Sequence, residues 1–431
     1  MSEPTGRMPV RDFPVRPNLE QLKHQAKDLL RGWRAGEAAA LELARAWHPR
    51  HATQVGEEGF ALKLSDAQLV VARSYGIPRW PRLVAACRMT DAIWRGDVEA
   101  VRGLVQHDPR LLVEDARGVK GNWGPPMSYA ANLGRDAIIE MLRGLGAEDV
   151  QFAFGRACLQ GQLETARRLM SMGARLVPGE VMGPCETQSG RGLRFLLELG
   201  AELADDKGDR LAPVGLVLET YCRNPKGKHE CLELIAEVWA KEGRPFPESA
   251  PMAVHRGRID LLERLVERDA GLLNRTFGHR EIYPLELGCS VDETYALHGT
   301  PLAGGTLLHL CVDNDEIEIA EWLLAKGADV NALAAVDADG FGGHTALFGC
   351  VVSQPWRVGL RRDAGFAELL LKYGADVRMR ASLRKRLRFA EDERLHEVRD
   401  VTALGWGRRF QNQAWVNTEA MRVIAEAGGQ E

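Results

Sequence analysis

No part of the sequence is apolar enough to cross a membrane. A spanning helix needs about 18 consecutive apolar residues, and no stretch approaches that length. The first 17 residues are polar, contain four prolines and lack the apolar segment of a secretory signal. We therefore expect a disordered leader over residues 1–17, no contact with a membrane, and a cytoplasmic protein.

An excess of positive charge and closely paired cysteines are also missing. The 431 residues include 56 basic and 60 acidic side chains, and a net charge of −4 gives the chain no general attraction for nucleic acid. The eight cysteines are scattered, and none stands in the Cys-x-x-Cys spacing of a zinc ribbon. We expect buried, reduced thiols, no metal site and no cofactor.

The common catalytic motifs are absent as well. The sequence contains no phosphate-binding Gly-Lys-Ser/Thr loop, no Gly-x-Ser-x-Gly nucleophile elbow and no His-Glu-x-x-His. Catalytic groups can nevertheless converge through the fold, so a small-molecule pocket or an enzyme remains the alternative to a binding protein. The candidates for such a site are His279, His298, His309, His344, Asp337 and Glu286.

What the sequence does contain is a repeated helical unit. Residues 305–332, GTLLHLCVDNDEIEIAEWLLAKGADVNA, form two short amphipathic segments. Thr306 is suited to cap a first helix over residues 307–312, and Gly327 is suited to end the second helix in the left-handed conformation. The second segment has one apolar face, formed by Ile317, Ala320 and Leu324. Such a pair cannot bury its apolar face alone, so copies should stack.

Nine copies of the second segment occur along the chain. Each places apolar residues in a frame of about twelve residues that usually ends in glycine. The frames end at Asp108, Gly146, Gly173, Gly200, Gly243, Asp269, Gly327, Gly374 and Gly428. Repetition on this scale predicts a solenoid, in which each repeat contacts only its neighbours.

The repeats resemble ankyrin repeats. TLLH at Thr306–His309 and HTALF at His344–Phe348 are similar to the Thr-Pro-Leu-His signature of that family, and GADVNA at Gly327–Ala332 is similar to the end of its repeat. The resemblance implies an all-α ankyrin-repeat solenoid of about nine helix-turn-helix repeats over residues 90–429. It also implies that His309 helps bond one repeat to the next.

A helical segment precedes the repeats. NLEQLKHQAKDLL and LSDAQLVVARSYGIPRWPRL, within residues 18–89, resemble a lead-in found before ankyrin repeats in some bacterial proteins. This resemblance suggests a bacterial source and names no activity. We expect an N-terminal helical cap over residues 18–89 that covers the apolar end of the first repeat.

The spacing of the repeats indicates where the chain carries extra segments. Steps of 26 or 27 residues in the middle leave no room for the turn that projects between ankyrin repeats, here called a finger, because a full repeat has about 33 residues. The last three steps are longer and predict inserted fingers at about residues 270–304, 333–343 and 378–401. Insertions in repeat proteins often lie on the binding face. The alternative is that these fingers pack on each other and seal the end of the solenoid.

The composition of the fingers favours recognition of a protein or peptide through them and through the concave face. Aromatic and arginine side chains commonly anchor such contacts. The candidates are Phe277, Tyr283, Phe341, Trp356, Arg384 and Arg388. The first finger can instead form a small core of its own. Asp337 and Asp339 resemble the start of a calcium loop, but Ala346 stands where its glutamate belongs.

The third finger has six basic residues between Arg378 and Arg388, followed by acidic residues at helical distance. This pattern favours ion pairing within the finger. An acidic protein or ligand is the second interpretation. Nucleic acid is not expected, because its recognition needs a wider basic surface.

Overall fold

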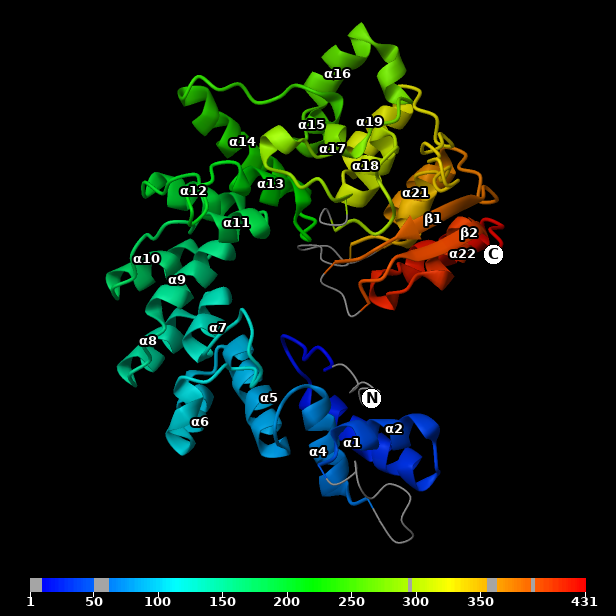
Figure 1. The fold of residues 1–431 in the computed structure, drawn as a ribbon. Coiled ribbons are helices and arrows are strands. Elements are labelled where there is room, and N and C mark those ends of the chain that lie inside the picture. The colour runs from blue at the N-terminus through cyan, green and yellow to red at the C-terminus, as the bar shows by residue number, and fades with distance from the viewer. Residues whose placement is uncertain (1–9, 50–61, 294–296, 355–362, 389–391) are drawn as a thin grey trace, which may run out of the picture. The chain divides into compact units, whose positions relative to one another are not determined.

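Helices make up most of the chain. The computed structural model describes residues 10–49, 62–293, 297–354, 363–388 and 392–431. The chain divides into two units, residues 1–175 and residues 176–431, which are described separately below (Figure 1). None of the helices in the described ranges is both long enough and apolar enough to span a membrane.

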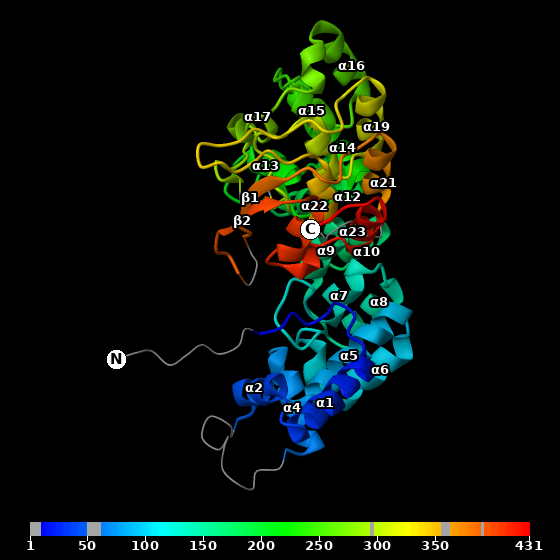
Figure 2. The same ribbon diagram turned by 90° about the vertical axis from the view of Figure 1, so that its right-hand side faces the viewer.

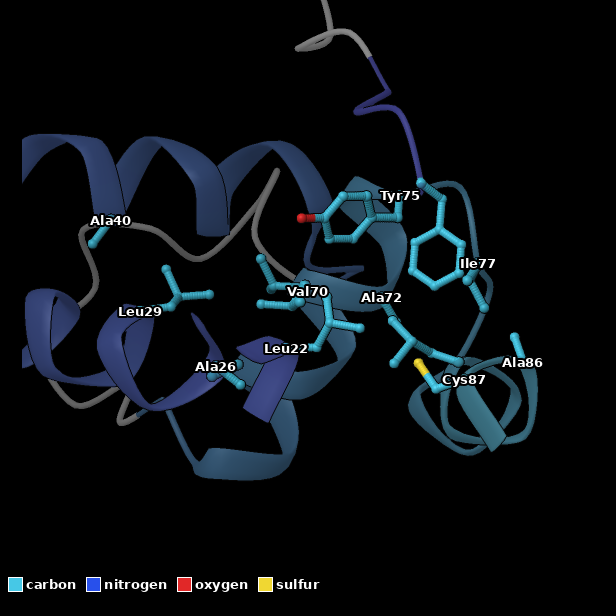
Figure 3. Close-up of a cluster of buried hydrophobic side chains, with 14 of the residues drawn as sticks. Leu22, Ala26, Leu29, Ala40, Val70, Ala72, Tyr75, Ile77, Ala86 and Cys87 are labelled. Carbon is cyan, nitrogen blue, oxygen red and sulfur yellow. The ribbon is translucent and has the colours of Figure 1, made fainter. Parts of the chain in front are cut away.

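The first unit begins with four helices that share one core. They are α1 (Leu19–Arg34), α2 (Ala38–Trp47), α4 (Leu64–Ser74) and α5 (Trp80–Arg95). Asn18 caps α1, since its side chain accepts a hydrogen bond from the backbone N–H of Gln21 at 3.1 Å. Leu22, Ala26 and Leu29 follow at helical spacing and are buried. Figure 3 shows Leu22 beside Val70 of α4, in the core that also includes Ala86 and Cys87 of α5.

Three helix pairs complete the first unit. They are α5 with α6 (Val98–His107), α7 (Pro126–Asn132) with α8 (Asp136–Gly144), and α9 (Val150–Leu159) with α10 (Leu163–Ser171). A short 3-10 helix, η1 (Pro109–Leu112), follows α6. α5 therefore contributes to the N-terminal core and to the first pair, and it runs through the expected boundary between cap and solenoid at residues 89 and 90.

The second unit contains six further pairs. They are α11 (Met182–Glu186) with α12 (Gly190–Glu198), α13 (Ala212–Glu219) with α14 (Pro225–Lys241), α15 (Ala250–His255) with α16 (Ile259–Arg268), α18 (Leu307–Asn314) with α19 (Ile317–Ala325), α20 (Leu347–Val351) with α21 (Gly365–Lys372), and α22 (Ala403–Arg409) with α23 (Thr418–Glu426). Every one of the nine expected frames is the second helix of a pair. The all-α solenoid of stacked helix pairs is thus confirmed.

The pair formed by α18 and α19 shows why the local prediction succeeds. Thr306 occupies the N-cap position of α18, which continues two residues beyond the expected end, to Asn314. Asp315 turns the chain with a φ of 65°, and Gly327 ends α19 with a φ of 97°. Both residues lie in the left-handed region, as a tight turn and a helix stop require.

The third finger is not helical, and this corrects the expectation of pairing at helical distance. It contains β1 (Ala381–Lys385) and β2 (His396–Val401), which pair antiparallel with Arg384 opposite Glu397. Residues of β1 are alternately buried and half-buried, the period of two that a strand requires. A strand of five residues is too short for this alternation to stand out in the sequence.

All eight cysteines are buried thiols outside any disulfide, as expected. Burial raises the pKa of Cys87 and of Cys185 to about 12, because the thiolate loses its hydration in the interior. These thiols pack as small apolar side chains within the helix pairs.

Candidate functional site

The three fingers of the second unit are joined by backbone hydrogen bonds. In the first finger, the N–H of Phe277 donates to the carbonyl of Gly305 at 2.9 Å. The N–H of Ala335 in the second finger donates to the carbonyl of Gly304 at 2.8 Å. The N–H of Gly342 then donates to the carbonyl of Ser382 in β1 at 2.7 Å. We call residues 270–304, 333–343 and 378–401 the joined fingers; Figure 2 shows α17, the yellow loop of the second finger and β1 along one side of this unit.

The second finger is a tight hairpin. The N–H of Asp337 donates to the carbonyl of Phe341 at 2.8 Å, and the N–H of Gly343 donates to the carbonyl of Ala334 at 3.1 Å. Gly342 has a φ of 120°, and a Cβ atom at this position would lie 2.1 Å from the carbonyl oxygen of Ala335. Only glycine fits here, as the glycine-rich sequence indicated.

Arg384 and Phe341 form an internal contact between the second and third fingers. The Arg384 guanidinium lies 4.9 Å from the centre of the Phe341 ring, and that of Arg399 lies 4.1 Å from it. Arg384 also donates to the carboxylates of Asp337 at 2.7 Å and Asp339 at 2.9 Å. Phe341 is buried. Neither predicted anchor is therefore free to insert into a partner, because each already holds the fingers together.

The remaining basic residues of the third finger are largely paired with acids. Arg378 pairs with Asp376, Arg380 pairs with Asp400, and Arg388 lies 3.3 Å from Glu393. The interpretation of internal pairing is confirmed in part. Arg380 and Arg388 pair within the finger, where a strand hairpin rather than a helix brings the charges together, whereas Arg378 and Arg384 pair with acids outside it.

The first finger has a small core of its own, which was the alternative to a recognition surface. It contains η2 (Ala270–Leu273), α17 (His279–Ile282) and η3 (Leu285–Leu287). Phe277 and Tyr283 are only 3% and 1% exposed, so they cannot act as exposed anchors. Their apolar rings stabilise the finger instead. Trp356, the remaining predicted anchor, lies outside the described residues.

His309 and His344 have a structural role. His309 Nδ1 accepts from the backbone N–H of Thr306 at 3.1 Å, and its Nε2 donates to the carbonyl of His344 at 3.0 Å. His344 Nε2 donates in turn to the carbonyl of Pro301 at 2.9 Å. Burial lowers the pKa of His309 to about 4 and that of His344 to about 3. Both rings are thus neutral, and the expected bond from His309 to the next repeat is confirmed.

The other members of the predicted catalytic group have different hydrogen-bond partners, although burial of His298, followed by nearby charges that include His279 and His344, lowers its pKa. His279 Nε2 donates to the carbonyl of Ser290 at 3.0 Å, Asp337 is bound to Arg384, and Glu286 is exposed. His298 is fully buried. Within the described ranges, no group of three or more histidine, cysteine or acidic side chains is arranged to hold a metal ion.

Two features of the second unit were not predicted from the sequence. Exposed apolar side chains occur on each of the joined fingers: Val291, Leu333, Val336 and Leu395, between 47% and 65% exposed. A buried ion pair joins Arg223, which follows α13, to Asp313 in α18 at 2.8 Å. The two residues are ninety positions apart, so no local pattern could reveal their contact.

A family model and a solved structure are similar to parts of this chain. The ankyrin repeat family model matches residues 303–335, the segment that holds α18 and α19. The crystal structure of the human ASB11 ankyrin repeat domain is similar over 71% of this chain and 99% of that chain, with 16% sequence identity and a TM-score of 0.22. No curated protein matches the sequence. The chain contains an ankyrin repeat, a unit that generally serves protein–protein interaction.

Proposed function

We propose that this chain recognises another protein without catalysis, and that the joined fingers, together with the concave face of the first helices, form the contact surface. Ankyrin repeats are generally protein-interaction units, which supports a scaffold role. Stacked repeats offer an extended surface for this purpose. The N-terminal lead-in sequence places this activity, in our proposal, in the cytoplasm of a bacterial cell.

One observation supports the fingers in particular. Their backbones are bonded into a single layer, and each finger nevertheless exposes an apolar side chain: Val291, Val336 or Leu395. The exposed carboxylates and guanidinium groups around them are mostly paired with each other. Exposed apolar side chains accompanied by polar and charged groups are common at protein interfaces.

Capture of partners by two matched variants tests this proposal. Val336→Asp places a charge on the second finger, where the side chain is 60% exposed. Val113→Asp makes the same change in the first unit at a side chain that is 66% exposed. Each variant is used to capture proteins from bacterial lysate, and the captured proteins are quantified by mass spectrometry. We expect proteins that bind to the wild type and to Val113→Asp but not to Val336→Asp. Equal retention by both variants would remove the fingers from the interface.

A further inference from the structure

The second unit contains a buried polar cluster around Arg223. This guanidinium has all its donors occupied: it binds the carboxylate of Asp313 at 2.8 Å and the carbonyls of Asp313 at 2.9 Å, Thr220 at 2.7 Å and Cys222 at 3.1 Å. A longer bond of 3.4 Å reaches the carbonyl of Leu297. Arg223 is 3% exposed, so this is a well-satisfied interior charge that can orient its neighbours.

Unlike Arg223, its neighbours contain polar atoms without hydrogen-bond partners among the described residues. Among the described residues, no hydrogen-bond partner exists for the Tyr283 hydroxyl, for either ring nitrogen of His298, for Asp313 Oδ1 or for Lys385 Nζ. None of these four residues is more than 3% exposed. Buried polar groups without partners are rare in native proteins and indicate a bound molecule that the protein chain does not supply. We call Arg223 and these four residues the Arg223 cluster.

Contacts and electrostatics connect the members of the Arg223 cluster. The Tyr283 ring lies 5.5 Å from the ring of His255, and Lys228 joins His255 to Asn314, the residue next to Asp313. Burial lowers the pKa of His298 well below its ordinary value, and the charges of Lys385 and Arg223 lower it further. Burial raises the pKa of Tyr283, and the charge of Asp313 adds to this effect. His298 directly follows Leu297, whose carbonyl accepts from Arg223. The cluster therefore combines side chains from α18, β1 and the first finger.

A second buried lysine shows what a satisfied ammonium group looks like in this fold. Lys228 is 1% exposed, and its Nζ lies 2.7 Å from Asn314 Oδ1 and 2.6 Å from His255 Nδ1. Lys385 is equally buried and has no such partner among the described residues. An ammonium group without partners in the interior is strongly destabilising compared with the small net stability of a folded domain. A ligand that supplies the missing bonds removes this cost.

The charge and the unpaired groups define the chemistry of that ligand. Among the buried charged groups that interact here, Arg223, Lys385 and Lys228 are positive and Asp313 and Glu316 are negative, so one positive charge remains in the interior. Burial lowers the pKa of Lys385, and the negative charges of Glu293 and Asp292 in the first finger partly offset this effect. Both acidic residues are half-exposed, and neither makes a hydrogen bond to Lys385 Nζ. The remaining positive charge fits a monoanion.

We propose that the Arg223 cluster binds a small monocarboxylate that also carries a hydroxyl group. The carboxylate oxygens accept from Lys385 Nζ and from the Tyr283 hydroxyl. The hydroxyl group of the ligand donates to Asp313 Oδ1, and a ring nitrogen of His298 completes the set. This site is independent of the proposed protein recognition, since its side chains are buried and the proposed protein contacts are made by exposed ones.

Two measurements on the full chain test the proposal. Mass spectrometry of the supernatant from denatured, purified protein should reveal a released hydroxy acid in an amount comparable to the protein. Thermal unfolding with L-lactate, D-lactate, propionate or inorganic phosphate should show a larger shift with a lactate enantiomer than with propionate. Tyr283→Phe should weaken this binding about tenfold, which corresponds to the loss of one hydrogen bond. Lys385→Met should abolish the shift.

A matched control separates binding from folding. The Tyr129 hydroxyl in the first unit is bonded to the carbonyl of Val15 and to Trp94 Nε1, both at 2.7 Å. Tyr129→Phe should lower the melting temperature and leave the ligand-induced shift unchanged. Tyr283→Phe should reduce the ligand-induced shift and leave the melting temperature of the ligand-free protein unchanged. Release of no small molecule together with no shift by any compound would mean that fixed water fills the cluster and would overturn the proposal. A shift with phosphate alone would overturn the carboxylate assignment.

Discussion

Gly327 illustrates a residue whose role follows from backbone conformation alone. Its φ is 97°, and a Cβ atom built on it would meet nothing within 4 Å. A larger side chain therefore has room, and the penalty comes from the left-handed backbone, which β-branched residues resist strongly.

Gly327→Val should lower the free energy of unfolding by about 1–3 kcal/mol, because the strained backbone cannot relax without moving the end of α19. Urea unfolding followed by circular dichroism measures the change. Gly103→Ala is the control, since Gly103 lies within α6 and also has open space around it. This control should stabilise the protein by about 0.5–1 kcal/mol. An unchanged midpoint for Gly327→Val would show that the helix end readily adopts another conformation.

The free-energy cost of burying Lys385 depends on pH. Burial lowers its pKa from 10.5 to about 8. Between these values the unfolded chain binds a proton that the native chain does not, so this lysine makes stability rise with pH by about 1.4 kcal/mol per unit. Below about pH 8 the ammonium group is charged in both states, and its full desolvation cost is present.

Lys385→Met should accordingly stabilise the ligand-free protein at pH 7 by on the order of 1–3 kcal/mol, because it removes an unpartnered charge and keeps the packing volume. The advantage over the wild type should shrink as the pH rises from about 8 toward 10.5. Urea titrations of both proteins across this range measure the difference. Lys372→Met, at a side chain that is 68% exposed, should change nothing at any pH.

At the scale of elements, the fingers behave as one layer rather than three loops. Each contributes a short segment of extended backbone, and bonds between Phe277 and Gly305, Ala335 and Gly304, and Gly342 and Ser382 connect them. Such short segments are weak alone, and pairing with neighbours is what stabilises them.

Gly342→Ala should break this layer in the middle. Its Cβ atom would lie 2.1 Å from the carbonyl oxygen of Ala335, and the backbone bond to Ser382 would be lost as the hairpin moves. Hydrogen exchange should become faster in residues 334–343 and 381–385 while α18 stays protected. Gly340→Ala is the control, since the nearest atom to its Cβ, in the Arg399 side chain, is 3.8 Å away and only its positive φ opposes the change. Equal exchange in both variants would contradict a joined layer.

At the scale of the whole molecule, the buried thiols couple stability to alkaline pH. Burial raises the pKa of Cys87 and Cys185 to about 12 and that of Cys222 to about 11, from an ordinary value of 9. Above pH 9 the unfolded chain loses thiol protons that the native chain keeps. The stability from these groups is therefore fully present below about pH 9 and is lost as the pH rises to about 12.

Under reducing conditions, the free energy of unfolding should consequently fall between pH 9 and pH 11. Urea unfolding at several pH values measures this slope. Cys87→Ala should make the decline shallower by about 1.4 kcal/mol per pH unit, since one fewer thiol titrates only in the unfolded state. A slope that is the same with and without Cys87 would contradict the buried thiol as its source.

The sequence by itself determined the helix pairs. Apolar periodicity, caps such as Thr306 and stops such as Gly327 act over a few residues, so the nine second helices and the resemblance to ankyrin repeats could be read without a structure. The inserted segments were also located from spacing, because an insertion changes the length of a repeat wherever it folds.

Only the tertiary structure showed which side chains of those insertions are buried and which partners they contact. The sequence does not show whether Phe277 and Tyr283 face a partner or a core. Their burial in the structure shows that both lie in a core. Arg384 pairs with two carboxylates of another finger, and Arg223 pairs with Asp313, which is ninety positions away in the sequence. Contacts of this kind depend on how distant segments meet, and side-chain type fixes only what each residue is able to bond, not which neighbour it receives.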